Sequence, residues 1–142
     1  MTPFVLDTNV LSELMKPSPN ERVLRWFDAH ANAEFATTAI NEAELLAGIA
    51  LLPDGKKKRR LADATEATLR NELGGRVYPF DSDAARELAV VVRARSRKGK
   101  PVDFQDACIA AICNARGAAI VTRDRSGFEA TGIVVIDPWG AA

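Results

Sequence analysis

The 142-residue sequence is poor in cysteine, histidine and long apolar runs, and each shortage excludes a class of protein. Two cysteines, Cys108 and Cys113, are too few for a disulfide scaffold. On one helix they would point about 140° apart around the axis, so they cannot bridge each other. The single histidine, His30, excludes a nuclease that uses a pair of histidines as acid and base. Zinc is also disfavoured, because few of its usual nitrogen and sulfur ligands are available.

Net charge and membrane-spanning runs are missing as well. The 19 basic and 19 acidic residues cancel, so binding to nucleic acid through net charge is excluded, although local patches remain. No apolar run approaches the roughly 20 residues that span a bilayer. The opening residues 1–3 lead directly into an apolar strand and carry no basic leader. We therefore expect a cytoplasmic protein in a reducing compartment.

What the sequence does contain is a regular alternation of strand-like and helix-like apolar patterns. With 47% hydrophobic residues and no linker, residues 1–142 are expected to form one domain. Strands separated by helices predict an α/β/α sandwich around a mainly parallel sheet of about four or five strands, in an order that the pattern leaves open. The expected strands are 4–6, 35–38, 77–80, 119–122 and 133–136; the expected helices begin at 7–9 and cover 21–30, 40–52, 56–73, 81–97 and 103–116.

Four acidic residues fall near one edge of this sheet. Asp7 ends the first strand and Asp124 follows the strand at 119–122. In an open α/β sheet, chemistry gathers beyond the carboxyl ends of the strands. Glu44 and Asp106 lie in the first turns of helices that can lean over the same edge.

Asp7 and Glu44 each have a structural alternative. Asp7 is a good N-cap for the helix that starts beside it. Glu44 fits the third position of a capping box opened by Asn41, in the pattern Asn-x-x-Glu. Taken singly, neither residue decides between a cap and a catalytic role.

Asp106 is the more specific signal, because its helix is apolar nearly all round and is therefore expected to be buried. A buried carboxylate is costly unless it is paired, hydrogen-bonded or bound to a metal. The alternative is that Asp103 caps the helix and Asp106 helps to satisfy its first amides. For Asp124, the alternative is a salt bridge to Arg123 or Arg125.

The four acids together point to a cation. Carboxylates that converge without matching basic residues repel one another strongly. Ligands that are all oxygen select a hard ion, Mg²⁺ or Mn²⁺. We therefore expect these acids to share a divalent metal site.

Four stretches in order carry a resemblance to a known family. They are Phe4-Val5-Leu6-Asp7-Thr8-Asn9, Glu44-Leu45-Leu46-Ala47-Gly48, Asp106-Ala107-Cys108-Ile109-Ala110-Ala111 and Ile120-Val121-Thr122-Arg123-Asp124, followed by Gly132-Ile133 and Pro138-Trp139. Over essentially its full length the sequence resembles the PIN-domain ribonucleases, specifically the VapC-like toxins of type II toxin–antitoxin systems and their FitB-like branch.

The resemblance implies a PIN-like fold and a metal-dependent endoribonuclease that hydrolyses RNA with metal-activated water. It assigns catalytic roles to Asp7, Glu44, Asp106 and Asp124, with Asp7 and Asp106 as metal ligands and Asn9 and Thr122 as supporting polar residues. One departure matters: relatives often carry an Asp directly before the Phe, whereas here Gly127 precedes Phe128. The acid therefore lies at the earlier position, Asp124.

RNA must be attracted by cations beside the acidic site. The candidates for RNA contact are Arg93, Arg95, Arg97, Lys98 and Lys100, with residues 56–60 as the second choice; a solvated helix end is the alternative for both runs. The resemblance also implies an antitoxin partner and a homodimer. Several apolar residues can either receive a partner's helix or pack in the protein's own core. They are Trp26, Phe27, Leu45, Leu46, Ile49 and Leu52.

Three competing functions are considered. A PIN-like binding module without catalysis is disfavoured, because all three core acids are present. A phosphoacceptor signalling domain would need an acid pair after the first strand and a lysine after the last, and both are missing around Asp7 and residues 136–138. DNA in place of RNA stays open, because metal chemistry does not distinguish the sugars.

Overall fold

The computed structural model describes residues 2–100 and 103–140, and at its centre lies a parallel five-stranded sheet. The order of the strands is β3-β2-β1-β4-β5, with every neighbouring pair parallel. The predicted α/β class and parallel sheet are confirmed. The strands are β1 (Phe4–Leu6), β2 (Phe35–Thr38), β3 (Val77–Tyr78), β4 (Ala119–Val121) and β5 (Val135–Ile136).

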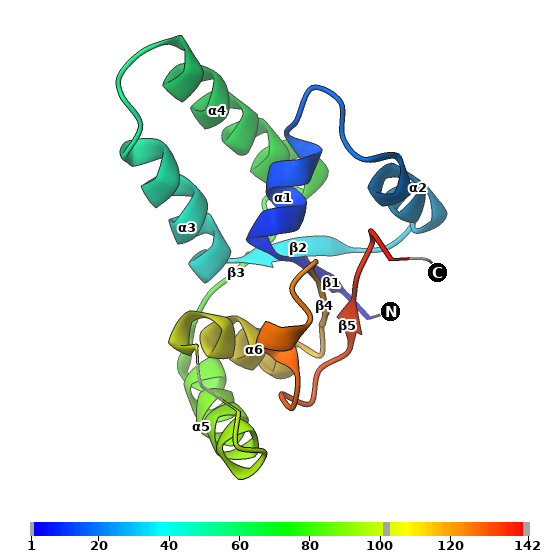
Figure 1. Ribbon diagram of the computed structural model, residues 1–142, viewed down its shortest axis with the longest axis vertical. Coiled ribbons are helices and arrows are strands. Elements are labelled where there is room, and N and C mark those ends of the chain that lie inside the picture. The colour runs from blue at the N-terminus through cyan, green and yellow to red at the C-terminus, as the bar shows by residue number, and fades with distance from the viewer. Residues whose placement is uncertain (1, 101–102, 141–142) are drawn as a thin grey trace.

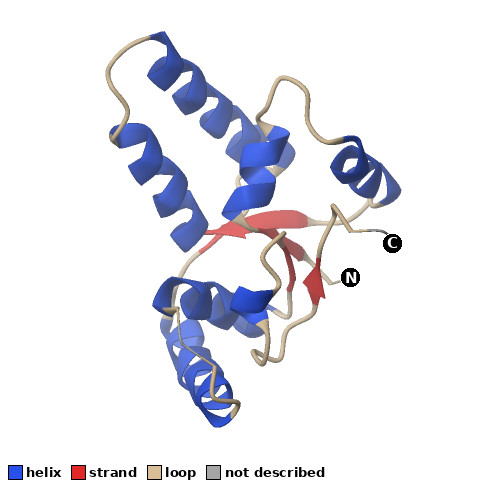
Figure 2. Cartoon of the chain, viewed as in Figure 1, coloured by secondary structure: helices blue, strands red, loops and turns tan. Residues whose placement is uncertain are grey.

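Helices cover both faces of this sheet (Figures 1 and 2). On one face lie α1 (Thr8–Leu14), α2 (Glu21–Ala29), α3 (Ala39–Ala50) and α4 (Lys56–Ala67); on the other lie α5 (Ser82–Arg97) and α6 (Phe104–Arg116). Two short turns complete the described elements: the π-helix η1 (Thr68–Glu72) and the 3₁₀-helix η2 (Ser126–Phe128). Among residues 2–100 and 103–140, no helix has both the length and the apolar character needed to cross a bilayer.

Alternate residues along each strand point to opposite faces of the sheet, and each face packs in its own core cluster. Val5 and Ile120 pack with α5, α6 and Phe128, whereas Leu6 and Val121 pack with α1 and Leu73. Successive strand residues point to opposite faces, so a strand covered on both sides must be apolar at every position. This explains why the short strands read as unbroken apolar runs.

Several boundaries differ from the sequence prediction. The strand expected at 133–136 is limited to β5, Val135–Ile136, and the helix expected at 40–52 ends at Ala50. Helix α3 begins at Ala39, directly after β2, and its N-cap is Thr38, whose hydroxyl accepts from the Asn41 amide N–H. The predicted capping box opened by Asn41 is therefore wrong. The predicted helix 56–73 changes to a π-helix at Thr68, before Gly74. The strand expected at 77–80 ends at Tyr78, because the next residue is Pro79, which has no N–H to donate to the ladder.

The apolar residues that were expected to serve either a partner or the core differ in how deeply they are buried. Trp26 and Phe27 pack against Phe4 and Phe35, with ring centroids 5.3 Å apart for Trp26–Phe4 and 5.0 Å for Phe27–Phe35. They therefore belong to the core. Leu46 on α3 is 52% exposed and is available for a partner.

Two adjacent valines of α5 test this description of the core. Val91 is fully buried, whereas Val90 is 58% exposed. We predict that Val91→Ala lowers the free energy of unfolding by about 2 kcal/mol, from two lost methyl groups and the cavity that they leave. Val90→Ala, the matched control, should change it by less than about 0.5 kcal/mol. Urea unfolding measures both values, and equal losses would contradict the burial assigned to α5.

Candidate active site

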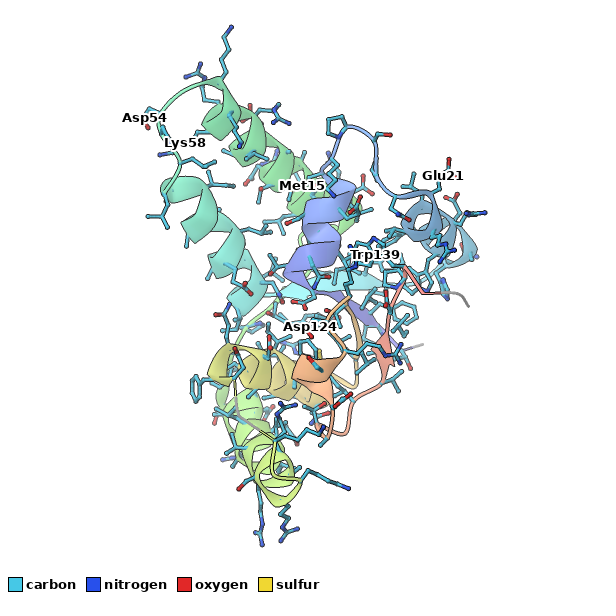
Figure 3. All side chains as sticks on the ribbon, viewed as in Figure 1. Met15, Glu21, Asp54, Lys58, Asp124 and Trp139 are labelled. Carbon is cyan, nitrogen blue, oxygen red and sulfur yellow. The ribbon has the colours of Figure 1, made fainter. Side chains whose placement is uncertain are left out.

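The acidic residues gather at the carboxyl edge of the sheet, around the end of β1. Asp7 follows β1, and β1 lies between β2 and β4. The chain passes from β1 to β2 on one side and returns as β4 on the other, so this edge is a topological switch point, where α/β proteins bind ligands. Asp124 follows β4, and Figure 3 shows it near the middle of the molecule, beside α6.

Asp7 is the most enclosed of the four acids, at 7% exposure. Its Oδ1 accepts from the Thr8 amide N–H (2.9 Å) and from Nδ2 of Asn41 (2.9 Å). Its Oδ2 accepts from Oγ1 of Thr122 (2.7 Å) and, more weakly, from Nδ2 of Asn9 (3.5 Å). Asp7 therefore does cap α1, as its structural alternative proposed, while both its oxygens are also oriented by neutral donors.

Asn41 is a site residue that sequence reasoning missed. It is fully buried, and its Nδ2 donates to both Asp7 Oδ1 and Thr8 Oγ1 (3.0 Å). Its Oδ1 accepts from Oγ1 of Thr38 (2.7 Å). Asn41 therefore ties the end of β2 and the start of α3 to the carboxylate that follows β1.

Glu44 lies one turn further along α3 and is exposed. Its Oε1 accepts from Oγ1 of Thr8 (3.1 Å), so the helix does lean over the edge at which Asp7 lies. Glu44 also lines a groove of about 480 Å³ between α1, α3 and α4, with Leu45 and Ile49 of α3 on its wall.

Asp106 has the most perturbed carboxyl group of the site. Burial, followed by the charges of Asp103, Asp7, Asp124 and Glu44, raises its pKa to about 7. Asp103 caps α6 by accepting from the Asp106 amide N–H (2.9 Å), as the structural alternative for this helix proposed. Within residues 2–100 and 103–140, no hydrogen-bond donor or basic group contacts the Asp106 carboxylate.

Asp124 is held by the turn that follows it. Its Oδ1 accepts from Oγ of Ser126 (2.7 Å) and from the Gly127 amide N–H (3.4 Å). Its own amide N–H donates to Thr122 Oγ1 (3.1 Å), which links it to Asp7. In the described part of the chain it forms no salt bridge to Arg123 or Arg125, so that alternative is wrong.

The predicted RNA-binding cations do not share one environment. Arg93, Arg97 and Lys98 are exposed on α5 and at its end, and Lys100 pairs with Glu129 (2.8 Å). Arg95 is only 6% exposed and donates to backbone carbonyls, so it is not the exposed cation that the sequence predicted. From the second basic run, Lys57 and Arg60 line the groove that contains Glu44.

The donor set suits a hard divalent cation. Burial and, after it, the charges of neighbouring carboxylates raise the pKa of Asp106, and a bound cation would relieve that repulsion. Carboxylate, amide and hydroxyl oxygens supply the site, and Cys108 and Cys113 are both buried as free thiols in α6. As they stand, no three His, Cys, Asp or Glu side chains of the described residues lie close enough to enclose an ion.

Comparison with known proteins identifies relatives along the whole chain. The PIN domain family model matches residues 4–134. VapC ribonuclease Y4jK of Sinorhizobium fredii is 42% identical over 98% of this chain and 99% of its own. Toxin FitB of Neisseria gonorrhoeae is 38% identical over 96% and 98%. The crystal structure of FitAcB from Neisseria gonorrhoeae superposes with a TM-score of 0.86 at 37% identity, over 97% of this chain and 99% of that one.

The raised pKa of Asp106 predicts how the stability of the metal-free protein depends on pH. Because the folded state holds this proton up to about pH 7 and the unfolded state releases it near pH 4, stability falls as the pH rises through that window. Asp106→Asn removes the ionisable carboxyl group and with it this loss of stability at higher pH. Since the group is half exposed, we expect a gain on the order of 1 kcal/mol above pH 7, or about 2–4 °C in Tm, and almost none at pH 4.

Melting curves in EDTA between pH 4 and 8 measure the effect, with Asp63→Asn on the exposed face of α4 as the control for loss of one negative charge. A large destabilisation by Asp106→Asn at every pH would instead mean that the carboxylate chiefly satisfies the first turn of α6.

Asn41 gives a second prediction. Asn41→Ala leaves Thr38 Oγ1 without its acceptor and Asp7 Oδ1 without one donor, both at buried positions. We expect a loss of about 1–3 kcal/mol in the free energy of unfolding by urea titration. Asn32→Ala, at an exposed turn position, is the matched control and should be nearly neutral. A neutral Asn41→Ala would show that Asp7 is held without it.

Proposed function

The chain belongs to the PIN-domain family, among its VapC- and FitB-like toxins, and we propose that it is the ribonuclease toxin of a type II toxin–antitoxin pair. The observation that carries the proposal is the Asp106 carboxyl, which is crowded by other carboxylates and has no basic partner among the described residues. In a family that contains a named ribonuclease, such a site suits hydrolysis of phosphodiesters with the help of a divalent cation.

In this proposal the four acids have different roles at the site. Asp7 and Asp106 hold Mg²⁺ or Mn²⁺, with Glu44 and Asp124 completing the carboxylate set. When bound, such an ion lowers the pKa of a water ligand and offsets charge on the scissile phosphate. Asn9 and Thr122 hold Asp7 in place, and so does Asn41 from the opposite side.

In this proposal, RNA approaches the acids along the basic residues that lie beside them. Lys57 and Arg60 share a groove with Glu44, and Lys100 shares a second cavity, of about 530 Å³, with Asp106 and Asp124. These cations offset the repulsion between RNA phosphates and the acidic site. Arg93, Arg97 and Lys98 extend this positive border along the end of α5.

An antitoxin is the protein partner in this proposal, since a toxin of this kind is harmless only while its site is covered. The groove between α1, α3 and α4 has an apolar wall that includes Leu45, Ile49 and Leu52, which suits an amphipathic helix.

We further propose a homodimer, one PIN-like domain over residues 1–142, and action in the cytoplasm.

Cleavage of a defined RNA by the partner-free protein tests the enzyme. We predict cleavage in Mg²⁺ or Mn²⁺, none in EDTA, and a preference for RNA over a DNA strand of the same sequence. Asp106→Asn should lower turnover at least about 100-fold, since loss of even an outer partner of a metal site costs 10–100-fold. Asp124→Asn should have the mildest effect of the four acidic positions.

Asp63→Asn, which removes one exposed acid far along α4, is the control and should retain activity. Cleavage that persists in EDTA, or that Asp106→Asn retains, would contradict the proposed mechanism. Preference for DNA would contradict the substrate class, and an inert protein in either metal, across RNAs of varied sequence, would favour a PIN-like binding module.

A further inference from the structure

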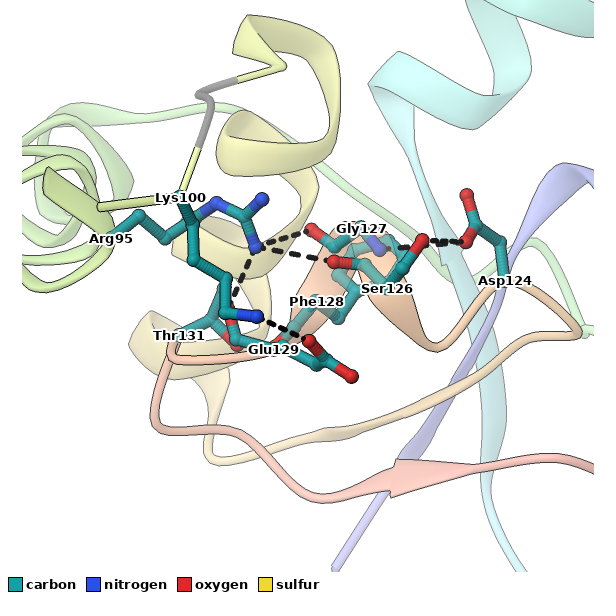
Figure 4. Close-up of polar contacts among 8 residues, drawn as sticks. All are labelled: Arg95, Lys100, Asp124, Ser126, Gly127, Phe128, Glu129 and Thr131. Atoms are coloured by element: carbon teal, nitrogen blue, oxygen red, sulfur yellow. Dashed lines mark hydrogen bonds and ion pairs between the residues drawn. The ribbon is translucent and has the colours of Figure 1, made fainter. Parts of the chain in front are cut away.

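Arg95, in the last turn of α5, is a buried cation without a catalytic role in the proposed function. It is 6% exposed, and its Nη1 donates to three carbonyl oxygens, those of Ser126 (3.4 Å), Gly127 (3.3 Å) and Glu129 (2.7 Å) (Figure 4). Burying a guanidinium is costly unless its N–H groups are satisfied. The three acceptors of Nη1 are all backbone carbonyls of one short segment, residues 126–129.

That segment contains the turn η2, and each of the turn's three backbone carbonyls accepts a hydrogen bond from a side chain. Short 3₁₀ turns have poor internal hydrogen bonds, so their carbonyls need outside donors. Thr131 Oγ1 donates to the Phe128 carbonyl, the one carbonyl of residues 126–129 that Arg95 does not reach. The Phe128 ring is also buried against α6. Arg95, Thr131 and Phe128 together leave the turn little freedom to move.

The opposite side of η2 meets the acids. Ser126 Oγ and the Gly127 N–H both donate to Asp124 Oδ1, as Figure 4 shows for the serine. The turn also lies directly against Asp106: a methyl group built on Gly127 would lie 2.5 Å from Asp106 Oδ2 and 3.4 Å from Asp124 Oδ2. A small displacement of η2 would therefore move Asp124 or collide with Asp106.

We propose that Arg95 is a positioning residue: by binding the carbonyls of η2 it fixes Asp124 beside Asp106, and so sets how tightly the site holds a divalent cation. The inference rests on the proposed function, because it assumes that the acids bind the ion. It replaces direct RNA contact as the role of Arg95. A guanidinium that is buried and donates to three carbonyls is poorly placed to bind a phosphate.

Mn²⁺ affinity of the partner-free protein, measured by electron paramagnetic resonance of free Mn²⁺, tests the inference without relying on turnover. We expect Arg95→Met to weaken Mn²⁺ binding about 10-fold, the scale of lost outer-shell support at metal sites. Arg86→Met, an exposed arginine on the same helix, removes the same charge and should leave the affinity unchanged. Arg95→Lys, which keeps the charge but lacks the forked donors, should fall between the two.

A double-mutant cycle with Asp124→Asn separates positioning from a general loss of structure. If Arg95 acts through Asp124, Arg95→Met should weaken Mn²⁺ binding much less in the Asp124→Asn background than in the wild type. Ser126→Ala, at an exposed position, removes the shorter of the two hydrogen bonds from η2 to Asp124, leaves that of the Gly127 N–H, and should weaken binding in the same direction. This variant carries the test if Arg95→Met does not fold.

Each remaining outcome overturns the inference. Equal effects of Arg95→Met in both backgrounds, or no effect of Ser126→Ala, would show that Arg95 does not act through Asp124. Unchanged Mn²⁺ affinity, with weaker RNA binding and a smaller salt dependence, would make Arg95 an RNA contact. If the wild-type protein binds no Mn²⁺, the proposed metal site itself fails, and the inference fails with it.

Discussion

Repulsion among carboxylates at the end of β1 is the constraint on which the rest of the site depends. Burial of Asp106, followed by the charges of Asp103, Asp7, Asp124 and Glu44, raises its pKa to about 7. A protein selected only for stability would place a lysine or arginine among these acids. Here the donors that surround Asp7 and Asp124 are amides and hydroxyls, which orient a carboxylate without cancelling its charge. The net negative charge is therefore preserved for a cation from solution.

The strand order of the sheet makes this arrangement possible. Because β1 lies between β2 and β4, donors from both neighbours reach Asp7: Asn41 just beyond β2 and Thr122 just beyond β4. Each of these contacts joins residues more than thirty positions apart in the sequence. The same hydrogen bonds that orient the carboxylate therefore also hold α3 and the β4 edge together, so stability and site geometry are coupled at these residues.

This coupling explains which parts of the site could be predicted from the sequence. Asp7 directly after an apolar strand, and Asp106 in a helix that is apolar nearly all round, are local patterns, and the elements that carry them lie close to where the patterns place them. Asn41 could not be recognised, because Asn-x-x-Glu is also a capping pattern. Only the direct passage of β2 into α3 shows that the cap is Thr38. The strand order likewise depends on packing between distant segments, which periodicity does not encode.

Arg95 illustrates the same limit and adds a physical reason for the choice of its partners. It lies in a run of basic residues that resembles a solvated helix end, yet it is buried and donates to the carbonyls of residues 126–129, about thirty positions further along the chain. Had its guanidinium paired with Asp106 or Asp124, it would have stabilised that carboxylate and lowered its affinity for a cation. By binding neutral carbonyls instead, it contributes rigidity to η2 while leaving the acidic charge uncompensated. A buried cation next to an acidic site can thus support metal binding, provided that its hydrogen bonds go to the backbone that positions the acids.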